Sequence, residues 1–95
     1  MQNFQVFHSN KLMGVFIDQI FPQDYKKVAD VKANNIDDVY SSTNSFEEFW
    51  GNNENVTVFG DKKYRSTSMG DIIVDENNNV FRCAFIGWDN LNIKL

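Results

Sequence analysis

Residues 64–74, with the sequence YRSTSMGDIIV, hold the densest group of reactive side chains in the 95-residue chain. A cation, Arg65, and three hydroxyls, on Ser66, Thr67 and Ser68, precede the carboxylate of Asp71. Arg65 and the serine hydroxyls could bind an anion such as a nucleotide phosphate, while Asp71 could act as an acid, a base or an orienting group. Arg65, Ser66, Ser68 and Asp71 are therefore the first candidate for a ligand site.

A turn that starts a buried strand would use the same residue types. Gly70 would take a backbone conformation that a side chain forbids, and Ser66 would cap the turn. Asp71 would accept local amide hydrogens or pair with Arg65. A nucleophilic serine also needs a positioned base, and the single histidine, His8, is far away in sequence. We favour the structural interpretation, with any function of the segment lying in recognition.

The single histidine and single cysteine give little support to catalysis or metal binding. His8 lies on or just after a short strand pattern, and no Cys and His spacing typical of a metal site is present. Cys83 alternates with Phe81 and Phe85, so we expect it on a buried face, where a thiol behaves as a small apolar group. We therefore predict an exposed or half-buried His8, a structural Cys83, and no catalytic residue, metal or cofactor.

The chain has nine Phe, three Tyr and two Trp, which is more than one small core obviously needs. Trp88 follows Gly87 and stands beside the polar residues Asp89 and Asn90, so it is the best candidate for an exposed contact with a partner. Trp50, at the start of a loop-like stretch, is the next candidate.

Length and charge narrow the class of protein. A chain of 95 residues is expected to form a single domain, residues 1–95, around one core. The net charge of −4 and the scattered basic residues disfavour nucleic acid as a partner. One cysteine fits a reducing compartment, and neither a signal peptide nor a membrane segment is visible, so we expect a cytoplasmic protein. The oligomeric state stays open.

The pattern of apolar residues predicts an α+β fold. In order, we expect a strand at 4–8, an undetermined connection with room for a short strand at 15–17, a strand at 25–33, a helix after Asn34-Asn35, a second helix after the capping-box pattern at 45–48, an extended segment at 56–59 and a hairpin at 71–86. In the strand at 25–33, Tyr25 and Ala29 should share one face. The result is a small antiparallel sheet that ends in this hairpin, with one or two short helices packed on it.

The order of these segments resembles the YodL-like domain family, small proteins carried by phages, plasmids and conjugative elements. In that family an R-S-x-S-x-G-D segment precedes a strand, and G-F or G-W follows the next strand. The matching residues here are Arg65, Ser66, Ser68, Gly70, Asp71, Gly87 and Trp88. The resemblance covers roughly residues 25–91 and implies an accessory protein of a mobile element, without an established activity to carry over.

Two functions follow as expectations. The first is a non-enzymatic protein that binds a protein partner through the surface near Trp88 and the segment from Arg65 to Asp71. Inhibition of a host defence factor is its most concrete form, by analogy with accessory genes of mobile elements. The second is a pocket for a small anion or nucleotide at Arg65, Ser66, Ser68 and Asp71.

Overall fold

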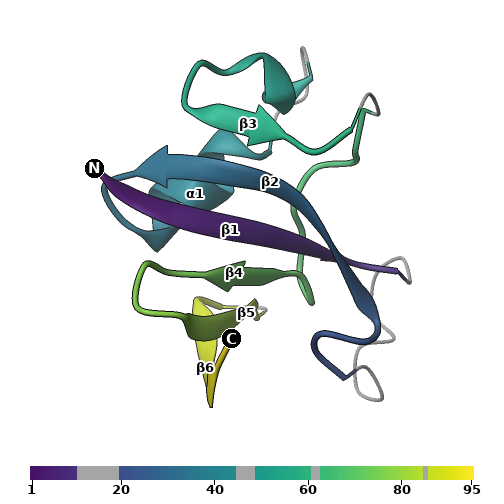
Figure 1. Ribbon diagram of the computed structural model, residues 1–95, viewed down its shortest axis with the longest axis vertical. Helices are drawn as coiled ribbons and strands as arrows, with labels where there is room; N and C mark the ends of the chain where they lie inside the picture. Colours follow the sequence, from purple (N-terminus) through teal and green to yellow (C-terminus); the bar gives the residue numbers. More distant parts are fainter. Residues whose placement is uncertain (11–19, 45–48, 61–62, 85) are drawn as a thin grey trace.

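The computed structural model describes residues 1–10, 20–44, 49–60, 63–84 and 86–95. Its framework is one six-stranded antiparallel sheet with the strand order β3-β2-β1-β4-β5-β6 (Figure 1). The elements along the chain are β1 (Gln2–Ser9), β2 (Tyr25–Ala33), α1 (Ile36–Ser42), the 3₁₀ turn η1 (Trp50–Asn52), β3 (Val56–Val58), β4 (Ile72–Val74), β5 (Asn79–Cys83) and β6 (Trp88–Lys94). The fold is therefore mostly sheet, and the expected α+β class is confirmed only in part.

A β-bulge interrupts the long pair formed by β1 and β2. The pairing shifts between Val6 and Phe7 of β1, which leaves Val28 of β2 as an extra residue. Such a residue changes which side chains point to which face of the sheet. Tyr25 and Ala29 consequently belong to different buried clusters, so the expectation that they share a face is wrong. In the sequence, the bulge corresponds to the apolar Val28, which falls between the positions where the alternation of this strand places apolar residues.

Apolar side chains are buried on both faces of the sheet. Figure 1 shows α1 lying across one face, behind β1 and β2. The cluster on that face consists of Phe4, Val6, Val28, Ala29, Val31, Ala33, Val39, Trp50, Val56 and Ile73. The cluster on the other face consists of Phe7, Tyr25, Ile72, Val74 and Val80, with Phe21 and Leu91 packed against it. Because β4 contributes to both clusters, its three residues are all fully buried.

The helix α1 begins where the sequence predicts. The Asn35 side chain accepts a hydrogen bond from the amide of Asp38 at 2.9 Å and so satisfies one of the free amides of the first turn. Asp37 and Asp38 lie in the same turn, where a negative charge is favourable beside the positive end of the helix dipole. The helix buries Val39 and leaves its acidic start exposed.

The predicted hairpin is present, but it does not end the sheet. β4 and β5 pair across a tight connection in which Asn78 has a positive φ of 65°, as the Asn-rich sequence suggests. The chain then adds β6, which pairs with β5 and forms one edge of the sheet. We did not predict β6, because an exposed edge strand with a positive φ at Asn92 carries no regular apolar alternation.

Two expected elements fall on residues outside the described ranges: the short strand at 15–17 and the capping-box pattern at 45–48. Where the sequence predicts the second helix, the described residues that directly follow this pattern form the 3₁₀ turn η1. Within the described ranges, no helix has the length and apolar character that crossing a membrane takes.

The cap of α1 gives a direct test of this local assignment. Replacing Asn35 with Ala should lower the free energy of unfolding by about 1 kcal/mol, because the Asp38 amide loses its acceptor. Urea denaturation measures the change. Asn34→Ala is the matched control, since Asn34 contributes its backbone carbonyl to a hydrogen bond with Gln2 and keeps it after the substitution. Equal losses in the two variants would contradict the assignment of the cap.

Candidate functional site

The carboxylate of Asp71 is the centre of the predicted Arg65 to Asp71 site, and it is fully buried. Its two oxygens accept from the Arg65 guanidinium, Nη1 to Oδ2 at 2.6 Å and Nη2 to Oδ1 at 2.8 Å. Oδ1 also accepts from the amide of Ser9 at 2.9 Å, and Oδ2 from the amide of Ser68 at 2.8 Å. A buried carboxylate with four charge-assisted or amide donors is well compensated for its loss of water.

Arg65 also donates to carbonyl and hydroxyl groups of the same turn and of the end of β1. Nη1 donates to the Ser66 carbonyl and the Ser68 hydroxyl at 3.1 and 3.3 Å, and Nη2 donates to the Ser9 carbonyl at 3.3 Å. Its side chain is 29% exposed. Hydrogen bonding to Asp71 raises the pKa of the guanidinium above its usual value. Arg65 is thus a permanent cation whose two terminal nitrogens point at acceptors from within the protein.

Neighbouring elements hold the backbone of residues 65–71 in place. The contacts are Trp50 Nε1 to the Arg65 carbonyl at 3.0 Å, the Thr67 amide to the Thr43 carbonyl at 2.9 Å, Asn44 Nδ2 to the Thr67 carbonyl at 3.0 Å, and the Tyr25 hydroxyl to the Gly70 carbonyl at 2.8 Å. Gly70 has a φ of 94°, the left-handed conformation expected of it. The segment is therefore a turn fixed on several sides before β4 begins.

His8 joins this cluster, contrary to the expectation of an exposed or half-buried side chain. It is only 2% exposed, because it lies near the C-terminal end of β1, against the turn of residues 65–71. Its Nε2 is 3.0 Å from the Thr67 hydroxyl and 3.9 Å from Asp71 Oδ2. Burial lowers the pKa of His8 to about 4, so the imidazole is neutral at pH 7. The separation of His8 from Arg65 in the sequence gave no hint of this contact.

The cluster does not have the geometry of a nucleophile, a base and an orienting acid. The base in such a triad contacts the hydroxyl through one ring nitrogen and the acid through the other. Here the Thr67 hydroxyl and the Asp71 carboxylate both lie nearest Nε2 of His8, and Thr67 is fully buried. Among the described residues, no buried polar side-chain atom lacks a hydrogen-bond partner. In this arrangement the charges of Arg65 and Asp71 neutralise each other within the fold.

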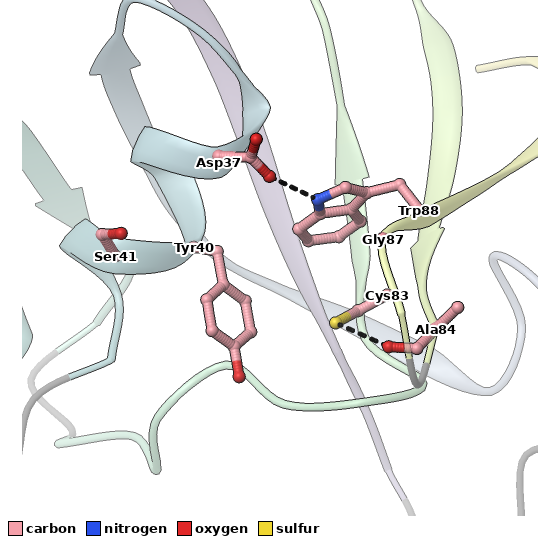
Figure 2. Close-up of a pocket in the computed structure, with 7 residues that line it drawn as sticks. All are labelled: Asp37, Tyr40, Ser41, Cys83, Ala84, Gly87 and Trp88. Carbon is pink, nitrogen blue, oxygen red and sulfur yellow. Dashed lines mark hydrogen bonds between the residues drawn. The ribbon is translucent and has the colours of Figure 1, made fainter.

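A second feature, a groove of about 310 Å³, lies between α1 and the turn that joins β5 to β6. Figure 2 shows its lining residues, which are Asp37, Tyr40, Ser41, Cys83, Ala84, Gly87 and Trp88. Asp37, Tyr40 and Ser41 share one side of α1 because they are three and four residues apart. We name this feature the α1–β6 groove.

Two aromatic rings and a carboxylate define the groove. The Trp88 indole Nε1 donates to Asp37 Oδ1 at 3.2 Å, and the rings of Tyr40 and Trp88 meet edge to face with centroids 6.1 Å apart (Figure 2). Both rings are half-buried, while Asp37 is exposed. Cys83 lies beneath them, and its burial raises the pKa of the thiol to about 11. The thiol is therefore protonated at pH 7, and it is buried as the alternation in the sequence predicts.

The residues singled out in the sequence thus separate into three places. Arg65, Ser66, Ser68 and Asp71 come together in the turn before β4. Trp88 lies in the α1–β6 groove. Trp50 is only 4% exposed and belongs to the main buried cluster, so its assignment as a surface site is wrong. A tryptophan that opens a 3₁₀ turn can face the core as readily as solvent, and sequence position alone did not decide between them.

The sequence interpretation missed the contact of His8 with Thr67 in the turn, and missed Asp37 and Tyr40 in the groove. The first pair meets only through the pairing of β1 with β4, which brings residues 59 positions apart into contact. Asp37 and Tyr40 carried a usable signal, since their spacing places them on one side of the predicted helix.

Comparison of the chain with models of known protein families, with curated proteins and with solved structures finds no match. The resemblance to the YodL-like domain therefore depends on the residues quoted above.

The buried ion pair predicts a large loss of stability when its carboxylate is removed. Asp71→Asn should lower the free energy of unfolding by about 3 kcal/mol, because it leaves Arg65 without its counter-charge and turns an acceptor into a donor. Urea denaturation at pH 7 measures this loss.

The control for Asp71→Asn is Asp30→Asn, which removes a partly exposed ion pair with Lys27 at the surface. That change should cost less than about 1 kcal/mol, since water screens surface pairs. Similar losses in the two variants would contradict the special position of Asp71.

Burial of neutral His8 predicts a dependence of stability on pH. The folded pKa of about 4 lies below the value of 6.5 for an unfolded chain. As the pH falls from about 6.5 to about 4, only the unfolded state gains this proton, so stability is lost across that window and levels off below it. The loss due to His8 should approach about 3 kcal/mol.

Denaturation from pH 7 to pH 4 of the protein and of His8→Gln measures this effect, because glutamine does not titrate. The original protein should lose stability more steeply than the variant. An NMR titration of the His8 ring in the unaltered protein gives a second readout, and a folded-state pKa near 6.5 would contradict the assignment.

Proposed function

We propose that this protein acts by binding a protein partner, and that the α1–β6 groove with Trp88 at its rim is the centre of the binding surface. The observation that carries the proposal is the pair of half-buried aromatic rings, Tyr40 and Trp88, open to a groove between two elements. Tryptophan and tyrosine in such positions commonly contribute most of the affinity of a protein interface. The exposed Ile86 adds apolar surface at the same turn.

The rigidity of the groove supports the same proposal. Trp88 is held by Asp37 and by Tyr40, and Cys83 beneath it pairs with the backbone of Gly70 and Asp71. A partner would therefore meet side chains that are already ordered, so less conformational entropy is lost on binding. The turn before β4 would then contribute to recognition indirectly, because its backbone holds Cys83 in place under the groove.

The alternative, a small-anion or nucleotide pocket at Arg65, Ser66, Ser68 and Asp71, has less support from the geometry. An incoming phosphate would have to displace Asp71 from a bidentate contact with Arg65 and would then face that buried carboxylate. Protein binding is the function that we put forward.

The resemblance to the YodL-like family suggests a narrower form of the same proposal. In that form the protein belongs to a phage or another mobile element, and its partner is a host defence protein that it inhibits. This step depends on the analogy with other accessory genes of such elements.

Replacement of Trp88 tests the proposal. Trp88→Ala should reduce the amount of partner captured from a lysate of the natural host by at least about tenfold, as the loss of a central aromatic contact does. Quantitative mass spectrometry of the captured proteins is the measurement. Phe59→Ala is the matched control, because Phe59 is 41% exposed but belongs to the region of β3, at the other edge of the sheet from β6. Circular dichroism should show both variants folded, and undiminished capture by Trp88→Ala would count against the groove.

A further inference from the structure

The α1–β6 groove combines two chemical features that favour a positive charge. The face of an indole or phenol ring attracts a cation, and the nearby carboxylate of Asp37 adds a full negative charge. We propose that the groove receives a lysine or arginine side chain of the partner, with its charged end between Trp88, Tyr40 and Asp37. This inference depends on the proposed function, because it names the chemistry of the partner at the same surface.

The protein itself shows this preference elsewhere. Lys27 lies with its ammonium group 4.6 Å from the centre of the Phe59 ring, and Lys26 lies 5.5 Å from the centre of the Tyr64 ring. Both rings therefore already have a cation from within the chain. In the described part of the protein, by contrast, no lysine or arginine lines the groove that holds Trp88.

The sheet directs Arg82, the basic residue beside Cys83, away from the groove. Arg82 precedes Cys83 on β5, and neighbouring residues of a strand point to opposite faces. Arg82 pairs with Ile72, which belongs to the cluster on the other face, whereas Cys83 lines the groove. Within the described ranges, no basic side chain lines the groove beside Asp37, so this place is open to a cation of a partner.

The local charge favours the same occupant. Asp37 and Asp38 are both exposed at the start of α1. The last turn of this short helix has no basic residue that would offset their charge. The positive end of the helix dipole is worth about half a charge at most, so it offsets these two carboxylates only in part. The net charge of the chain is also −4, which attracts basic segments of a partner at long range.

The groove has room for one long side chain. A volume of about 310 Å³ is at the lower end of the range for ligand pockets, which is about 300 to 1,000 Å³. A long aliphatic stem could lie over Ala84 and Gly87, with its charged end reaching Asp37.

Short peptides test the inference without knowledge of the partner. The probes are acetyl-Gly-Lys-Gly-amide and the neutral analogue in which norleucine replaces lysine. The readout is the NMR signal of the Trp88 indole N–H, assigned with Trp88→Phe, because this group donates to Asp37 and responds when a cation competes for the carboxylate. We expect the lysine peptide to shift this signal with an affinity at least about threefold higher than that of the norleucine peptide, and the difference should shrink in high salt.

Two variants isolate the role of the carboxylate. Asp37→Asn keeps an oxygen acceptor for the Trp88 indole and removes the charge, so it should weaken binding of the lysine peptide about threefold or more and leave the norleucine peptide unchanged. Asp38→Asn is the matched control, since Asp38 is the next residue of the same helix turn but does not line the groove, and it should have a smaller effect.

The outcomes separate the two proposals. Equal binding of the lysine and norleucine peptides, with no effect of Asp37→Asn, would overturn the preference for a cation while leaving a groove that binds a neutral side chain. No shift of the Trp88 signal with either peptide would also overturn it. The capture experiment with Trp88→Ala would then still decide the proposed function by itself.

Discussion

The fold depends on how one buried carboxylate is neutralised. Asp71 stands immediately before β4, the strand that contributes to the clusters on both faces of the sheet. A charge at this depth is tolerated only with several close donors, and these come from Arg65, from Ser68 and from the end of β1 at Ser9. The same contacts join an irregular segment to two strands. The carboxylate therefore connects the turn, β1 and β4 into one unit.

This arrangement bears on where we propose that a partner binds. The side chains in the turn before β4 that looked most reactive in the sequence are largely used for contacts within the protein, and burial keeps His8 neutral beside them. On the other side of the same turn, the backbone of Gly70 and Asp71 pairs with Cys83, which lies under the α1–β6 groove. The groove keeps its aromatic rings half open to solvent. These contacts are the reason why we propose the groove, and not the turn, as the surface that meets other molecules.

The sequence predicts those parts of the fold that depend on local chemistry. The cap at Asn35, the positive φ of Gly70 and Asn78, the β4–β5 hairpin and the burial of Cys83 all follow from residue type and spacing. The parts that it does not predict depend on contacts between distant segments. His8 contacts Thr67 only when β1 pairs with β4. Trp50 is buried because it packs into the main apolar cluster, whose members come from several elements. β6 pairs with β5 although it has no apolar pattern of its own. Arg65, Ser68 and Asp71, which lie close together in the sequence, are also in contact in the structure, but the strand pairing that adds Ser9 to them is a property of the sheet.

Native-state hydrogen exchange at the Ser68 amide tests the central position of Asp71 most directly. This amide lies outside every helix and strand, and it donates to Asp71 Oδ2 at 2.8 Å. The Cys83 amide, which donates to the Asp71 carbonyl, is the reference. If the carboxylate connects the turn to the sheet, the free energy of the opening that lets the Ser68 amide exchange should be nearly as large as that for the Cys83 amide. Exchange of Ser68 at the rate of an exposed loop amide, with Cys83 still protected, would contradict this account.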